Sequence, residues 1–143
     1  MAVYAGKVVV VTGASQGIGK ALCLELASIR PRLVLAARDG AALETVAALP
    51  TTGRRIAVLG EMRELGKSSE RYHREIGEFA ATCKLDVLVC VGPNAAMIAD
   101  AAGKSGMDPK VISTFVDAPS AAPAVRKLAK KNDLVLLKAS RGI

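Results

Sequence analysis

Apolar residues follow two alternating patterns along the chain. Short β-branched runs predict strands buried on both faces, at residues 7–12, 32–37, 56–59, 87–91, 111–115 and 134–137. Between these runs, apolar residues recur every three or four positions, which predicts amphipathic helices. The expected helices cover 17–29, 40–49 and 69–83, then one that begins after a cap at Asn94 and one that begins at Ser120.

The helical spacing also predicts which residues face the core. The expected buried faces are Ile18, Leu22, Leu26 and Ile29; Leu43, Val46 and Ala47; Tyr72, Ile76, Phe79, Ala80 and Cys83; and Ile98, Ala101 and Ala102. Starting the last helix at Ser120 places Pro123 in the first turn, where its missing N–H costs nothing.

Strands that alternate with helices predict an α/β fold with right-handed crossovers. We expect a three-layer, doubly wound, Rossmann-like parallel sheet of about six strands with helices on both faces. The first strand is expected in the centre, with the second beside it. No linker or low-complexity segment interrupts the pattern, so residues 1–143 are predicted to form a single domain.

Composition is consistent with one folded domain. The 143 residues are 51% hydrophobic, too many for a disordered chain. No apolar run approaches the roughly 18 residues that cross a bilayer. The N-terminal residues lack the basic, apolar and cleavage regions of a secretory signal. We therefore expect a cytoplasmic chain with no membrane partner.

The net charge of +7, from 20 Lys and Arg against 13 Asp and Glu, first suggests a nucleic-acid partner. The cations are dispersed, however, and the densest group, 126–131, is typical of a solvated helix end. Only 3% of residues are aromatic, which leaves few stacking platforms. Cys23, Cys83 and Cys90 form no CxxC pair, so reduced core thiols are expected and a metal site is not. We predict no nucleic-acid partner.

A glycine-rich turn joins the first strand to the first helix. Such a turn lets backbone N–H groups at the start of a helix approach a pyrophosphate. A cation at the end of the second strand, Arg38, can pair with a ribose 2′-phosphate. The simpler interpretation is a tight turn and a solvated strand end. The candidate cofactor-binding residues are Gly13, Ser15, Gln16, Gly17, Ile18, Gly19 and Arg38.

The sequence TGASQGIG after VVVV, followed by LVLAARD, resembles the start of NADP-type short-chain dehydrogenases/reductases over residues 5–40. The resemblance implies that the seven residues above would contact NADP. That family also uses an Asn-Asn-Ala-Gly element and a Ser with a Tyr-x-x-x-Lys pair. The chain lacks them: Val8 and Ile76 stand four residues after Tyr4 and Tyr72. Without a proton donor, hydride transfer has no acid–base partner.

The remainder resembles the C-terminal domain of Mur ligases, in the branch that adds D-alanyl-D-alanine. The resemblance rests on RRIAVLGEMRELGKSSERYHREIG, DVLVCVG and LVLLKASRG and covers residues 41–143. It implies a domain that closes over ATP and the incoming dipeptide. Glu61 stands where Asp is expected, and Ala139 where Gly is expected. His73 matches a histidine of the pattern; we interpret it as a structural histidine, since no nucleophile accompanies it.

No complete catalytic machinery is recognisable. The candidates for a phosphate loop, at Lys20, Lys67 and Lys104, all lack the required earlier glycine. We interpret the chain as an engineered chimera of two families: a designed scaffold, not an enzyme, with no catalytic residues and no required cofactor. The alternative is a binding module that retains NADP(H) at the glycine-rich turn. The oligomeric state is not determined by the sequence.

Overall fold

The computed structural model describes residues 8–12, 32–36 and 40–138, and side chains within 40–138. All six predicted strands fall within one residue of their expected bounds, and β3 extends one residue further at each end. The elements are β1 (Val8–Thr12), β2 (Arg32–Ala36), α2 (Ala41–Ala48), β3 (Arg55–Gly60), η2 (Gly66–Ser68), α3 (Ser69–Thr82), β4 (Val87–Val91), α4 (Ala96–Lys104), η3 (Pro109–Val111), β5 (Ile112–Phe115), α5 (Ala118–Leu128) and β6 (Leu134–Lys138).

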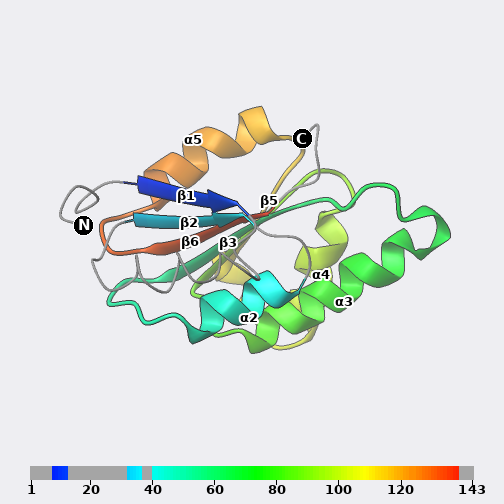
Figure 1. Ribbon diagram of the computed structural model, residues 1–143. Coiled ribbons are helices and arrows are strands. Elements are labelled where there is room, and N and C mark those ends of the chain that lie inside the picture. The colour runs from blue at the N-terminus through cyan, green and yellow to red at the C-terminus, as the bar shows by residue number, and fades with distance from the viewer. Residues whose placement is uncertain (1–7, 13–31, 37–39, 139–143) are drawn as a thin grey trace.

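The strands form one sheet in the order β1-β2-β6-β3-β4-β5, and every neighbouring pair is parallel (Figure 1). A parallel α/β sheet flanked by helices was predicted and is confirmed. The predicted position of the first strand is wrong: β1 lies at an edge, beyond β2. The reason is that β6 inserts between β2 and β3, pairing Val34 with Val135 and Ile56 with the same residue. Hydropathy along a strand does not encode its neighbour.

Alternate residues of the central strands enter two separate cores. Ala57 and Leu59 of β3 face α2, α3 and α4, whereas Ile56 and Val58 face α5. This alternation explains the continuous apolar runs, because both faces of the sheet are covered. In Figure 1, α5 lies above the sheet, and α2, α3 and α4 lie below it.

The predicted helix faces are confirmed for α2 and α4 and partly wrong for α3. Leu43 and Val46 of α2 and Ile98 of α4 are buried. On α3 the most buried residues are His73, Gly77 and Ala80. Tyr72, which was expected in the core, is exposed on its surface. Its ring instead lies 4.8 Å under the Arg71 guanidinium in a cation–π contact. The predicted face of helix 17–29 lies outside the described residues.

Two helix starts differ from the sequence prediction. The α4 helix is preceded by Ala95, not capped by the Asn94 side chain. The α5 helix starts at Ala118, because the Asp117 carboxylate accepts a hydrogen bond from the N–H of Ser120 at 2.8 Å. Pro123 therefore lies inside the helix rather than in its first turn. Pro119, in the first turn, occupies the position that was assigned to Pro123.

The described part of the chain contains no helix that is long and apolar enough to cross a membrane. Two of the three predicted reduced core thiols, Cys83 and Cys90, are free and buried. Burial raises the pKa of the Cys90 thiol to about 12, so it stays protonated at neutral pH. Cys23 lies outside the described residues. Among the described residues, no group of acidic, His and Cys side chains could hold a metal ion.

Arg55 fixes the end of α2 to the start of β3. Its Nε donates to the carbonyl of Val46 at 3.2 Å, and its Nη2 donates to the carbonyl of Leu49 at 2.9 Å. The helix carbonyls at this end otherwise lack partners, and a cation is favourable at the C-terminus of a helix. The Asp86 carboxylate accepts the backbone N–H of Arg55 at 2.7 Å.

Replacing Arg55 by Met is therefore expected to lower the free energy of unfolding by about 1–2 kcal/mol. The reason is that the α2 carbonyls lose their donors while the aliphatic contacts remain. Urea unfolding measures the effect, and amide exchange should speed up in Ala41–Ala48. Arg71→Met on the exposed face of α3 is the control, with an expected change below about 0.5 kcal/mol.

Candidate functional site

The carboxyl edge of the parallel sheet is where an open α/β fold places its ligands. Two loops meet there, one after β3 and one after β4. The N–H of Glu61 donates to the carbonyl of Val91 at 3.0 Å, and the N–H of Gly92 donates to the carbonyl of Phe115 at 2.9 Å. These bonds extend the β3–β4–β5 pairing past the strand ends. The chains at this edge therefore leave the sheet in a fixed order and direction.

Glu61 joins the two loops through its carboxylate, which is largely buried. Oε2 accepts the backbone N–H of Asn94 at 3.2 Å, and Oε1 accepts the Nε of Arg63 at 3.3 Å. The side chain packs against Gly92, whose φ is +110°, and a Cβ there would lie 3.0 Å from Glu61 Cγ. Both carboxylate oxygens are thus occupied within the protein. Glu61 therefore supports the edge by joining its two loops.

His73 holds the β3 loop from the side of α3. The N–H of Met62 donates to Nε2 at 2.9 Å, so Nε2 accepts and Nδ1 carries the proton. Nδ1 lies 2.6 Å from the carbonyl of Ser69, which accepts that proton. The side chain has no exposed surface. This geometry fits the structural interpretation of His73. Both ring nitrogens form hydrogen bonds with backbone groups, and the buried ring cannot reach a substrate.

Arg63 is the cationic side chain that the β3 loop presents at this edge. Its guanidinium is half exposed while its Nε contacts Glu61. Lys138, at the end of β6, lies in register with Leu59 of β3, so its strand reaches the same edge. A guanidinium oriented by a buried carboxylate is suited to binding carboxylate or phosphate groups. The site can therefore recognise an anionic ligand but shows no nucleophile–base pair among the described residues.

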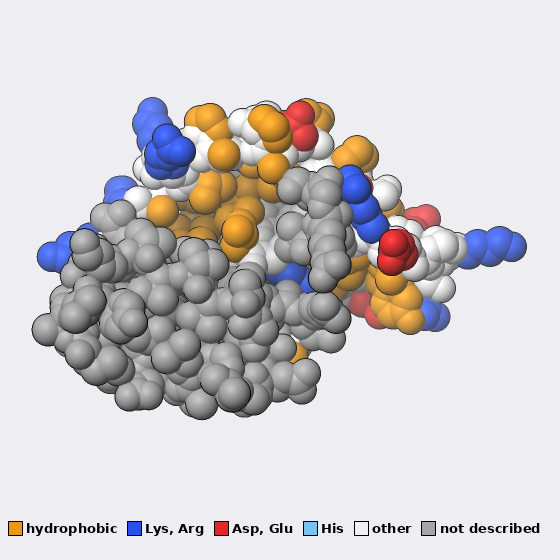
Figure 2. All heavy atoms as spheres, turned by 45° about the horizontal axis from the view of Figure 1, so that its top comes forward, with side chains coloured by type: hydrophobic (Ala, Val, Ile, Leu, Met, Phe, Trp, Pro, Cys, Tyr) orange, Lys and Arg blue, Asp and Glu red, His pale blue; other side chains and the backbone are white. Residues whose placement is uncertain are grey.

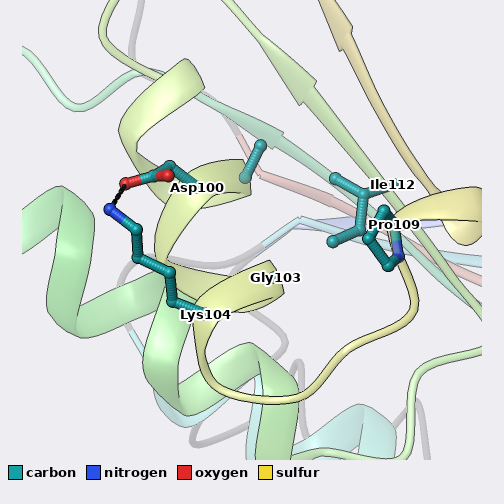
Figure 3. Close-up of a pocket in the computed structure, with 6 residues that line it drawn as sticks. Asp100, Gly103, Lys104, Pro109 and Ile112 are labelled. Carbon is teal, nitrogen blue, oxygen red and sulfur yellow. Dashed lines mark hydrogen bonds and ion pairs between the residues drawn. The ribbon is translucent and has the colours of Figure 1, made fainter.

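Away from this edge, a hollow of about 430 Å³ lies between α4 and β5 (Figure 3). Pro109 and Ile112 line it on one side, and Asp100, Gly103 and Lys104 of α4 line it on the other. Its charged rim is already paired, since Lys104 donates to Asp100 at 2.9 Å. Asp100 also accepts a hydrogen bond from Arg74 of α3. The hollow is open, and its described polar groups are satisfied, so we assign it no ligand.

The sequence-predicted cofactor residues lie outside the described residues. This holds for Gly13, Ser15, Gln16, Gly17, Ile18, Gly19 and Arg38. The structure instead brings together Glu61, Arg63 and Asn94. The sequence marks Glu61 only as a departure from Asp and Asn94 only as an expected helix cap, and it gives no sign that the three meet. The only sequence signal for this group is that Glu61 and Asn94 each follow a predicted strand closely.

Comparison with known proteins identifies the region that contains this edge. Residues 39–141 match the family model described as "Mur ligase, glutamate ligase domain". The chain belongs to the Mur ligase family. The match begins just before α2 and includes all four strands from β3 to β6, with the Glu61, His73 and Asn94 contacts.

Two relatives of this Mur ligase chain are ligases by name. It is 35% identical over 103 residues to UDP-N-acetylmuramoyl-tripeptide--D-alanyl-D-alanine ligase of Bacillus subtilis, covering 72% of this chain and 22% of that protein. It is 33% identical over 90 residues to the Synechocystis ligase of the same name, covering 63% of this chain and 19% of that protein. The chain thus spans about a fifth of the length of these relatives.

Solved structures agree with the sequence matches. The MurF ligase from Thermotoga maritima in complex with ADP is 33% identical, with a TM-score of 0.53, over 71% of this chain and 21% of that one. A MurF structure from Acinetobacter baumannii is 28% identical, with a TM-score of 0.58, over 71% and 22%. The predicted resemblance to the C-terminal domain of the D-alanyl-D-alanine branch is confirmed.

The resemblance to short-chain dehydrogenases/reductases is supported more weakly. The chain is 36% identical over 111 residues to an uncharacterized short-chain type dehydrogenase/reductase, y4eK, of Sinorhizobium fredii. That match covers 78% of this chain but 39% of the relative. This match does not establish that the chain is a fusion of segments from two families.

The predicted engineered chimera is wrong, because the family match and its relatives indicate a natural Mur ligase domain. The alternative of an NADP(H)-binding module is overturned by the same finding, and nothing in the comparisons supports NADP(H) binding. The prediction that the chain is not an enzyme is also wrong, because the chain matches proteins named as ligases. It had relied on missing machinery that a domain of this length need not contain.

Proposed function

We propose that this chain serves as the ligase domain that helps bind D-alanyl-D-alanine and a nucleotide during ligation to a UDP-N-acetylmuramoyl peptide. The observation that carries the proposal is that Glu61 holds Arg63 and the Asn94 loop together at the carboxyl edge of the sheet. This edge lies in the region that matches the Mur ligase model. A dipeptide carboxylate and nucleotide phosphates are the anions that the Arg63 guanidinium suits. The relatives' names and the ADP in the Thermotoga complex support this choice of ligands.

The division of roles follows from the chemistry of the edge. Arg63 binds an anionic group, Glu61 orients Arg63 and the Asn94 loop, and His73 fixes the backbone at Met62. None of these groups supplies a base or a nucleophile. Phosphate activation therefore falls to residues outside this edge, and the domain contributes binding and orientation.

Amide spectra of the isotopically labelled chain test the proposal. Titration with ADP–Mg²⁺, and separately with D-alanyl-D-alanine, should shift the amides of Met62, Arg63 and Asn94. The amide signal of Lys84, which lies just before the amino end of β4, should not shift. Arg63→Ala should weaken binding about tenfold, the loss expected for one charge-assisted contact. Arg71→Ala, a cation of the exposed α3 face, should leave binding unchanged.

Two outcomes contradict the proposal. Equal shifts with L-alanyl-L-alanine would remove the stereochemical specificity. Saturable binding that is unaffected by Arg63→Ala would place the ligand elsewhere on the chain.

We further propose that residues 1–143 form one doubly wound, Rossmann-like domain of six strands in the cytoplasm. Pairing of β2 with β6 supports a single sheet, and helices on both faces support the doubly wound arrangement. Coincident loss of far-ultraviolet ellipticity and of Cys90 protection against a thiol reagent would support one cooperative unit. Two separate transitions would contradict it.

A further inference from the structure

A cluster of cations lies at the end of the sheet opposite the Glu61 edge. The segment 118–131 contains four Lys or Arg and no Asp or Glu. Two of the cations lie in the last turn of α5 and two follow the helix. We name the four the basic loop: Arg126, Lys127, Lys130 and Lys131. All four are exposed. In Figure 2 blue side chains gather at the upper left, the side on which α5 ends in Figure 1, with no red beside them.

The basic loop differs from the other cationic surface of the described chain. On α3, Arg71 pairs with Glu75, and Arg74 pairs with Glu70 and Asp100. Within residues 40–138, no acidic side chain pairs with any cation of the basic loop. The helix C-terminus favours the first two cations, but Lys130 and Lys131 lie beyond the helix. Like charges at this spacing repel one another unless a counter-charge is present.

The backbone that carries these lysines is held in place. The Asp133 carboxylate, almost fully buried, accepts the N–H of Lys130 at 2.9 Å and the Nη2 of Arg54 at 2.6 Å. The same Nη2 donates to the carbonyl of Leu128 at 2.7 Å. Thr51 donates its hydroxyl to the carbonyl of Asn132 at 2.9 Å. The loop is therefore presented in one conformation, which reduces the entropy lost on binding.

The surroundings of the basic loop decide which anion it fits. The apolar residues that α5 exposes are all small, namely Pro119, Ala122, Pro123 and Ala124. The exposed large apolar residues of the described chain lie elsewhere, at Tyr72, Val116 and Leu137. A membrane-surface helix needs such anchors, and nucleic acid needs aromatic platforms or base-reading groups. An acidic stretch of protein needs neither.

We propose that the basic loop, presented by Asp133 and Arg54, is a docking site for an acidic segment of a partner protein. Carboxylates of that segment pair with the four exposed cations while the small residues of α5 allow close approach. The site is separate from the proposed ligand-binding edge, because it follows the last helix at the strands' amino ends. Its occupation would neither require nor block binding at Arg63.

The test uses the full chain and an N-acetylated hexaglutamate peptide, followed by fluorescence anisotropy at about 0.01 M and 0.15 M salt. Lys130→Ala with Lys131→Ala should weaken binding about three- to tenfold. The matched control is Lys67→Ala with Lys110→Ala, which removes two exposed cations that form no ion pair with any side chain of residues 40–138. It should change affinity by less than about twofold. Circular dichroism confirms that both variants fold.

The variant Asp133→Asn separates the effect of holding the basic loop in place from the effect of net charge. It makes the chain more positive, yet it should weaken hexaglutamate binding, because the loop loses its anchor. If Asp133→Asn does not fold, the two double variants still decide the matter.

Three results overturn the proposal. Equal losses in the two double variants would mean that only net charge attracts the peptide. Tighter binding to vesicles rich in phosphatidylserine, or to a single-stranded DNA oligonucleotide, at equal charge would assign the loop to a membrane or to nucleic acid. Absence of hexaglutamate binding at about 0.01 M salt would remove the site.

Discussion

Gly77→Ala is expected to lower the free energy of unfolding by about 3 kcal/mol, even though alanine favours helices by about 1 kcal/mol over glycine. A Cβ on Gly77 would lie 2.3 Å from the carbonyl oxygen of Ile98 and 2.8 Å from the Cβ of Ala101. The first of these is backbone and cannot rotate away. Helices α3 and α4 must therefore separate, which opens the core they share with the sheet.

Thermal and urea unfolding measure this effect. The midpoint of thermal unfolding should fall by roughly 6–12 °C, the shift expected for this loss in a chain of this size. Gly103→Ala on α4 is the matched control, because the nearest atom to its added Cβ is 3.9 Å away. It should be neutral or stabilising by up to about 1 kcal/mol. Equal destabilisation by both variants would contradict the proposed contact.

His73→Ala is expected to cost about 3–5 kcal/mol, from the cavity left by a buried ring and from the loss of a hydrogen-bond acceptor. The N–H of Met62 loses its partner, so the β3 loop loosens at the carboxyl edge. Faster amide exchange at Met62, together with a lower urea midpoint, measures both consequences.

Two substitutions distinguish the hydrogen bond from the volume of the ring. His73→Gln can place an amide oxygen near the position of Nε2 and should restore Met62 protection in part. His73→Asn places its polar atoms near Nδ1, closer to the Ser69 carbonyl, and should not restore it. If both variants protect Met62 equally, the Nε2 contact is not what holds the loop.

Acid should remove a stabilising contribution from Asp133. Burial raises the pKa of this carboxyl, but hydrogen bonds from the Arg54 side chain and from the backbone N–H groups of Arg54 and Lys130 lower it by more, so the net shift is downward. A lowered pKa in the folded state stabilises the protein above the unfolded value of about 3.9. That contribution is lost as the pH falls through the lower, folded-state pKa.

Urea midpoints at neutral pH and below pH 4 test this dependence. Asp133→Asn should be less stable than the natural chain at neutral pH, and the difference should shrink as the pH falls below about 4. Glu75→Gln, at an exposed pair on α3, is the control and should have little effect at either pH. A constant difference at all pH values would contradict the role assigned to the Asp133 charge.

The sequence alone determined which segments form strands and which form helices, and which residues of each recur on a buried face. Apolar runs such as Ile56–Leu59 and Val87–Val91 are strands because each alternate side chain has a core to enter, on one face or the other. The helical spacing of Leu43 and Val46 likewise predicted the buried face of α2. The motif spacing from residue 54 onward carried enough information to predict the Mur ligase resemblance.

Only the tertiary structure decided which elements are neighbours. The position of β6 between β2 and β3 arises from pairing between segments about 80 residues apart, which no local pattern records. The same holds for the contact of Glu61 with Asn94 and for that of Arg54 with Asp133. A carboxylate in a sequence carries no sign of whether it will be exposed or will be buried against a partner. That choice depends on long-range packing, which buries Glu61 against the Asn94 loop as a support of the edge.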